Sequence, residues 1–271
     1  MQSGKVKRSF VHYLPVYGCW STGIIYLAVG VIAILSYLQI KEGGADESAL
    51  LAFLNDSLAG RILLWIILLG TVSYVVWRIF ESLKDPYGYG KSGKGIALRT
   101  GIAVSTIPDA LIAFTAVQIL LGASSIRVDG RPVQLRQMVN SMLEENWGEV
   151  AIISTGIITC LSALVQFFYG VSRGYKERVD ILHFSADMKW LTHFFAWIGY
   201  GARGIILGII GFFFLKAGIM RSGKYAVNTD KAFDFIGDNV GHLYFILIAI
   251  GTIGYGVFMF IHGWAYDPDK D

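Results

Sequence analysis

Charged residues are scarce in this chain. Only 16% of its 271 residues are Asp, Glu, Lys or Arg, against roughly 25% in soluble domains. Hydrophobic residues make up 54%, and the mean hydropathy is +0.54. A soluble fold has no place for so much apolar surface, whereas a bilayer provides one. The shortage of charge therefore excludes an ordinary soluble domain and predicts an integral membrane protein.

The sequence also lacks the motifs of familiar catalytic and nucleotide-binding sites. It contains no Walker motif, GxSxG or HExxH, and its histidines and cysteines do not follow zinc or haem spacings. Gly199, Gly201 and Gly204 fit GxGxxG, but they begin an apolar helix, so we discount a nucleotide role. The net charge of +3 is too small to indicate nucleic acid. We predict a protein that is not an enzyme and needs no cofactor or metal.

Cysteine is nearly absent, because only Cys19 and Cys160 occur and both lie in apolar stretches. Buried free thiols are expected there rather than a disulfide framework. The first apolar stretch is too long for the core of a signal peptide and lacks a small-residue cleavage site, so we expect it to be retained as a helix.

Six apolar stretches are long enough to span a membrane, since a spanning helix needs roughly 20 residues. They cover about 13–40, 60–84, 97–122, 148–173, 191–219 and 241–265. The loop inside each pair carries a short amphipathic segment, which we place at the outer interface. These segments cover 48–54, 133–143 and 231–236. The prediction is a single all-α membrane domain over 1–271 with six transmembrane helices.

The first and third helix pairs share residues at a fixed offset of 181 positions. Gly23-Ile24-Ile25 and Gly70-Thr71 recur as Gly204-Ile205-Ile206 and Gly251-Thr252. Such self-similarity predicts a repeated two-helix unit. The middle pair is divergent and aligns only through a small residue followed by two aliphatic residues, beside Asp109. We expect three repeats, at about 10–88, 96–176 and 190–268, arranged with pseudo-threefold symmetry.

Glycines at spacings of three, four and seven are predicted to let the helix backbones approach closely. They are Gly23, Gly30, Gly204, Gly208 and Gly211.

This pattern resembles the bacterial family catalogued as domain of unknown function 1206. The motifs that carry the resemblance are Ser21–Gly30, Gly70–Tyr74 with Asp85-Pro86, Ala202–Gly211, and Gly251–Tyr255 with Asp267-Pro268. The family's Ala-Arg-Gly triplet is kept only at Ala202-Arg203-Gly204, whereas the first repeat reads Ser21-Thr22-Gly23. The resemblance covers nearly the whole chain. It implies a six-helix membrane fold and no established activity.

Three polar residues are predicted at equal depth on the first helix of each repeat, namely Thr22, Asp109 and Arg203. A lone charge at the middle of a membrane costs on the order of 3 kcal/mol, so Asp109 and Arg203 are expected to pair. The pair is either functional, as an ion site, a substrate site or a proton relay, or it is a structural ion pair that fixes packing. An alternative is that Pro108, which lacks a backbone N–H, kinks the helix at this depth and exposes carbonyl oxygens.

Secondary candidates lie near the inner membrane interface. Arg78 and Glu81 are spaced for a pair within one helix, and snorkelling to the interface would also explain them. His193 and His262 could hold a haem axially, or they are simply interfacial.

Aromatic residues near the middle of the spans either line a lipid or quinone pocket or pack toward lipid. They are Trp77, Trp197 and Phe212-Phe213-Phe214.

The most economical function is a non-enzymatic binding or scaffold module of the bacterial inner membrane. Its expected partners are membrane lipids, another membrane protein or a second copy of itself. The alternative is a small-solute or ion transporter or channel that uses the Asp109/Arg203 site. Twelve of the 23 Lys and Arg residues lie on the side of the termini and nine on the other, so we expect both termini in the cytoplasm.

Overall fold

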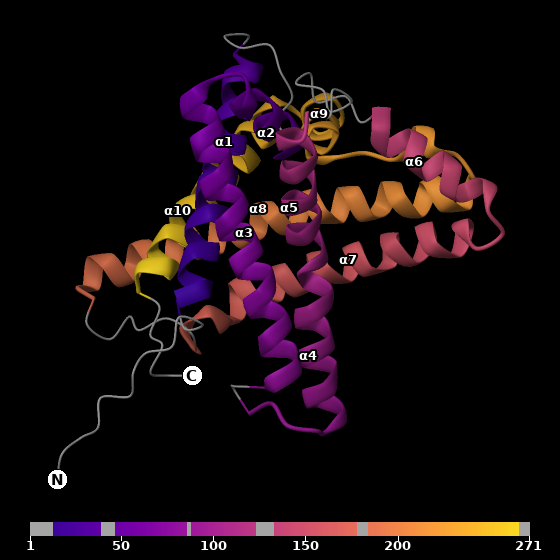
Figure 1. Cartoon of the computed structure of the whole chain (residues 1–271). Helices are drawn as coiled ribbons and strands as arrows, with labels where there is room; N and C mark the ends of the chain where they lie inside the picture. The colour runs from indigo at the N-terminus through magenta and orange to yellow at the C-terminus, as the bar shows by residue number, and fades with distance from the viewer. Residues whose placement is uncertain (1–12, 39–46, 86–87, 123–132, 178–183, 266–271) are drawn as a thin grey trace.

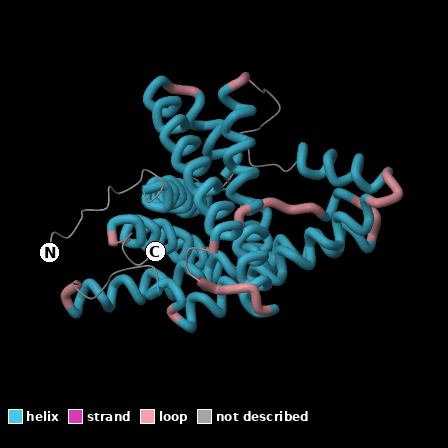
Figure 2. Tube along the Cα trace, turned by 60° about the horizontal axis from the view of Figure 1, so that its bottom comes forward, coloured by secondary structure: helices cyan, strands magenta, loops and turns pink. Residues whose placement is uncertain are grey.

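The described part of the chain is helical throughout. The computed structural model describes residues 13–38, 47–85, 88–122, 133–177 and 184–265, and Figure 2 shows only helices and loops in them. Five helices are long and apolar enough to cross a membrane. They are α1 (Leu14–Tyr37), α3 (Leu58–Lys84), α7 (Gly148–Ser172), α8 (Ala186–Ile219) and α10 (His242–Trp264). These helices confirm the all-α prediction and five of the predicted spans, and they indicate a multi-pass membrane protein.

The stretch 97–122 was predicted as one span in which Pro108 could introduce a kink, and the structure divides it into two helices. The structure has α4 (Gly93–Ser105) and α5 (Ile107–Leu120), with Thr106 between them. The Thr106 amide donates to the carbonyl of Ala103 at 3.2 Å, which tightens the last turn of α4. Pro108 lies in the first turn of α5 and has no N–H, so the regular helical hydrogen bond cannot continue through it. The count of six spans therefore stays a prediction.

The three short amphipathic segments are confirmed as helices. They are α2 (Glu47–Asn55), α6 (Val133–Glu144) and α9 (Thr229–Asn239), and two 3₁₀ turns, η2 (Gly174–Glu177) and η3 (Gly223–Tyr225), complete the described structure. Leu51 of α2 and Phe233 of α9 are fully buried. Figure 1 places α2 and α9 together at one end of the bundle. The two helices therefore contribute to the core as well as covering that end.

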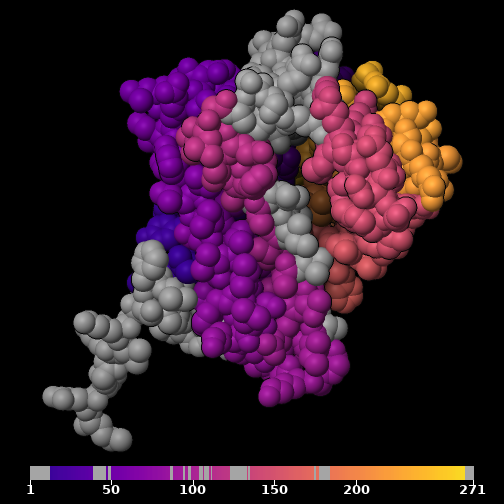
Figure 3. Space-filling model, turned by 45° about the vertical axis from the view of Figure 1, so that its right-hand side comes forward, coloured from indigo at the N-terminus to yellow at the C-terminus, as the bar shows by residue number. Residues whose placement is uncertain are grey.

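The five long helices and α5 form a row in which each helix packs on the next. The order is α5, α3, α1, α10, α8 and α7. In Figure 1, α1 and α3 run alongside α4 and α5, whereas α7 and α8 cross them. Between the two ends of the row, Figure 3 shows a hollow in the surface with α5 on one side and α6 and α7 on the other, and we call this the open side of the row.

Glycine lets neighbouring backbones touch at two of the predicted positions. A Cβ on Gly30 of α1 would lie 2.9 Å from the carbonyl oxygen of Ala249 in α10. A Cβ on Gly211 of α8 would lie 3.1 Å from the carbonyl oxygen of Gly156 in α7. Both distances are shorter than a normal carbon contact, so only glycine fits these crossings, as the spacing predicted.

The first and last helix pairs share one close contact at the 181-residue offset. A Cβ on Gly70 would lie 2.6 Å from the Cβ of Ser21, where α3 crosses α1. A Cβ on Gly251 would lie 2.6 Å from the Cβ of Ala202, where α10 crosses α8. Sequence agreement at this offset is therefore accompanied by the same local packing. The arrangement of the whole chain as three repeats stays a prediction.

Candidate functional site

Arg203 lies near the middle of α8 and contacts two tyrosines from other helices. The Cζ of its guanidinium is 4.9 Å from the ring centroids of both Tyr26 in α1 and Tyr255 in α10. Nη1 of Arg203 also donates a hydrogen bond to the Tyr255 hydroxyl. The two rings pack edge to face, with centroids 5.1 Å apart. Cation–π contacts of this kind are worth about 2 kcal/mol when desolvated, so the tyrosines help to stabilise a charge inside the bundle.

A small chamber lined by both polar and apolar side chains, which we call the polar chamber, adjoins Arg203. Its volume is about 30 Å³, and Glu47, Thr229 and Thr252 contribute to its wall. Glu47 Oε2 accepts a hydrogen bond of 2.9 Å from Thr229 Oγ1, so α2 and α9 meet here. A water molecule needs roughly 10–15 Å³ of such space. The chamber is therefore large enough for one or two waters or an ion of similar size.

Sequence reasoning missed Glu47 because it stands alone at the start of a short segment. The one sequence pattern that relates Glu47 to another residue is the repeat offset of 181 positions. Glu47 lies 181 positions before Asn228, whose side chain caps the N-terminus of α9 by accepting from the Lys231 amide.

The predicted group of Thr22, Asp109 and Arg203 is only partly described. Thr22 is buried on α1, one helical turn from the Tyr26 ring that Arg203 contacts. The backbone of Asp109 belongs to α5, but its side chain lies outside the described residues. The structure thus brings Arg203 to the helix that carries Thr22, and pairing of Asp109 with Arg203 stays a prediction.

Arg78 and Glu81 form an ion pair within α3. Arg78 Nη1 is 3.1 Å from Glu81 Oε2, and the Glu81 side chain is fully buried. Trp77 is also buried, with only 3% of its surface exposed, and its ring packs on that of Phe80. Burial explains Glu81 better than snorkelling to the interface does, and the pair stabilises the packing of α3.

The two candidate histidines adjoin a cluster of aromatic rings at the end of the bundle where α10 ends. His193 Nδ1 is 2.7 Å from the hydroxyl of Tyr175 in η2. The Phe258 ring lies 5.1 Å from the Tyr175 ring and 5.6 Å from the His262 ring. Tyr175 is 1% exposed, and this burial raises the pKa of its hydroxyl above the ordinary value. Tyr175 holds His193 in place, and no sequence pattern predicted this contact.

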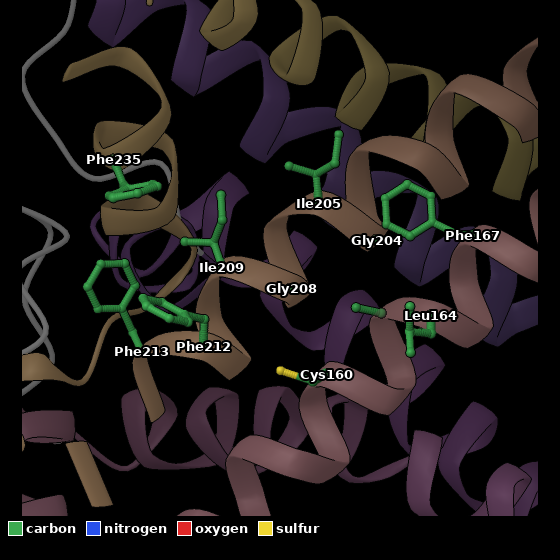
Figure 4. A pocket seen from close by; sticks show the side chains of 11 residues that line it. Cys160, Leu164, Phe167, Gly204, Ile205, Gly208, Ile209, Phe212, Phe213 and Phe235 are labelled. Atoms are coloured by element: carbon green, nitrogen blue, oxygen red, sulfur yellow. The ribbon is translucent and has the colours of Figure 1, made fainter. Parts of the chain in front are cut away.

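An apolar groove with a volume of about 460 Å³ runs along α7 and α8. Eleven residues line it, none of them charged (Figure 4). Phe235 of α9 closes one end, with its ring 5.3 Å from that of Phe213. Phe212 and Phe213 line the groove, as one sequence prediction proposed for this run, whereas Trp197 lies outside it and is 62% exposed.

Gly208 leaves space in this groove because it has no side chain. A Cβ on Gly208 would have only the Cβ of Ala163 within 4 Å, at 3.9 Å. Positions 204, 205, 208, 209 and 212 line the groove, whereas 203, 206, 207 and 210 face the polar chamber. The groove and the chamber therefore lie on different faces of α8. Ile209 also packs against the core that includes Ala113 of α5, so the groove lies toward the open side of the row.

Comparison with known proteins gives a family without an assigned activity. An uncharacterized protein of Bacillus subtilis (strain 168), YxxB, is 26% identical over 247 residues, which cover 91% of this chain and 88% of the relative. No solved structure matches the chain. The family model described as Domain of Unknown Function (DUF1206) matches residues 17–85 and 198–265, two segments that begin 181 positions apart. With half of its length matched by this model, the chain belongs to the DUF1206 family.

Proposed function

We propose that this protein is a non-enzymatic membrane module that holds the apolar chain of a membrane lipid in the groove between α7 and α8. The observation that carries the proposal is the groove itself, about 460 Å³ of space lined without a single charged side chain. Ligand pockets commonly measure about 300–1,000 Å³ and are mostly apolar. In a membrane, acyl chains are the most abundant molecules that fit such a lining.

The open side of the helix row supports access from the bilayer. The surface there is hollowed, with α5 on one side and α6 and α7 on the other (Figure 3). A chain that slides in laterally keeps its headgroup at the interface, so no polar group has to cross the apolar core. We place the protein in the bacterial inner membrane with both termini in the cytoplasm, on the balance of basic residues.

We also infer that the helices of the row form three repeats related by pseudo-threefold symmetry, as in a ring that is open at one point. The neighbour order supports this inference, because the first helix of each repeat packs on the second helix of another. These pairs are α1 with α10, α5 with α3, and α8 with α7. In this arrangement the middle repeat has opened, and the groove lies beside the opening.

Filling the groove tests the function. Gly208→Phe places a ring in the groove, since its Cβ meets no atom closer than 3.9 Å. Gly201→Phe is the matched control on the same helix, because a Cβ there has nothing within 4 Å and position 201 does not line the groove. Native mass spectrometry in a mild detergent should detect bound lipid on the wild type and the control only. Equal lipid binding by all three proteins would overturn the proposal.

A transporter is the second candidate function, and two features of the structure favour it. The helix break at Thr106 and the polar chamber beside Arg203 resemble the interrupted helices and midplane sites of transporters. The chamber contains a carboxylate, Glu47, so protons are the first substrate to test. In liposomes with an internal pH dye, proton flux that is lost in both Glu47→Gln and Arg203→Gln would favour transport. Flux equal to that of empty liposomes would exclude proton transport.

A further inference from the structure

The face of α8 that lines the groove continues to a lysine. Residues 205, 209, 212 and 216 are three or four positions apart and therefore lie on one side of the helix. Lys216 is the first charged residue on this side beyond the groove, three residues before α8 ends at Ile219. Its Nζ is 6.0 Å from the ring centroid of Phe213, which lines the groove. A positive charge is thus placed at the Ile219 end of the groove.

Two further basic residues gather at the same end. The Nζ atoms of Lys216 and Lys224 lie 4.8 Å and 4.9 Å from the ring centroid of Tyr225. Arg136 of α6 donates through Nε to the carbonyl of Ala226, the residue after Tyr225, at 3.2 Å. We call Lys216, Lys224 and Arg136 the basic cluster. Its members come from three separate parts of the chain and converge on η3.

Three carboxylates near this end are engaged elsewhere. Glu149 pairs with Arg221, and Asp230 and Asp234 pair with Lys231. In the described segments of the chain, neither lysine of the basic cluster has a carboxylate within 4.0 Å. Two ammonium groups that share one aromatic ring repel each other. An anion between them would relieve this repulsion.

We propose that the basic cluster binds the phosphate of an anionic phospholipid whose acyl chain lies in the groove. This inference rests on the proposed function, since the groove supplies the site for the chain. A helix end is where the headgroup region of a bilayer is expected, so a phosphate there lies within reach of both lysines. A zwitterionic lipid carries its own cation, which would be repelled by the cluster. The site therefore favours lipids with a net negative charge.

The experiment compares two lipids on the full-length protein. Wild type in mild detergent is titrated with phosphatidylglycerol and with phosphatidylcholine of the same acyl chains, and bound lipid is counted by native mass spectrometry. Each lysine near an anionic lipid surface contributes about fivefold in affinity, so the double variant Lys216→Gln/Lys224→Gln should lose roughly 25-fold for phosphatidylglycerol. Lys84→Gln/Lys91→Gln, exposed lysines at the opposite end of the bundle, is the matched control and should keep the preference.

Each outcome separates the headgroup site from the groove. A preference for phosphatidylglycerol that only the Lys216/Lys224 variant loses supports the inference. Equal binding of both lipids by the wild type overturns it, while the groove proposal survives if Gly208→Phe still removes them. Absence of any lipid from the wild type overturns both. Inorganic phosphate at the same concentration should not displace the lipid; displacement would show that the cluster binds a free anion without a chain.

Discussion

Alanine at Gly211 should destabilise the protein, whereas alanine at Gly208, one turn away on the same helix, should not. A Cβ at position 211 would lie 2.6 Å from Sγ of Cys160 and 2.8 Å from the Cys160 amide nitrogen. Carbon atoms pack at about 3.5–4.0 Å, so α7 and α8 would have to move apart by roughly 1 Å. At position 208 the nearest atom is the Cβ of Ala163 at 3.9 Å, an ordinary contact.

The expected size follows from these distances. Overpacking costs about 1–3 kcal/mol, and each kcal/mol lowers the melting temperature by about 2–4 °C in soluble proteins of 150–250 residues. Gly211→Ala should therefore melt on the order of 5 °C below the wild type. Gly208→Ala should match the wild type or exceed it slightly, because alanine is the better helix former.

Thermal unfolding followed by tryptophan fluorescence in one detergent measures both variants. The two glycines differ only in how close α7 approaches. Equal melting temperatures for the two variants would mean that α7 approaches α8 equally closely at both glycines. That result would refute the packing that creates the groove.

Three further substitutions test the buried polar contacts through the same melting measurement. Arg203→Lys keeps the charge but loses the planar guanidinium over two rings, and should cost about 1–2 kcal/mol; no change would contradict the cation–π contacts. Tyr175→Phe removes the hydroxyl next to His193 and should cost about 1 kcal/mol; a wild-type midpoint would show that this hydrogen bond is unimportant. Arg99→Met removes bonds of 2.7 Å and 2.8 Å to carbonyls in the last turn of α3 and a contact with Asp85, and should cost about 1–3 kcal/mol; an unchanged melting curve would mean that α3 ends without this support.

The long apolar helices could be predicted because membrane insertion depends on local composition. The predicted span at 148–173 and the observed α7 differ by one residue. The glycine crossings were also foreseeable, since small residues at helical spacing are how membrane helices pack. Gly30 and Gly211 both make the close approaches that this spacing predicts.

Features that depend on tertiary placement could not be predicted in this way. Gly208 and Gly211 look alike in the sequence, yet one lines a cavity and the other lies against a neighbouring backbone. Glu47 and Tyr175 flank apolar segments like many interfacial residues, and only the fold brings them inside. The division at Thr106 was signalled by Pro108 alone, and a proline in a membrane helix kinks it as often as it ends it.

The most direct test of lipid binding in the groove is photo-crosslinking with a phospholipid that carries a diazirine near the end of its acyl chain. Cells or membranes are irradiated, and the modified peptides are mapped by mass spectrometry. We expect adducts concentrated on residues of the groove, such as Leu164 of α7 and Phe212 of α8, and their loss in Gly208→Phe. Adducts spread evenly over exposed apolar residues such as Leu69 of α3, and unchanged by Gly208→Phe, would contradict lipid binding in the groove.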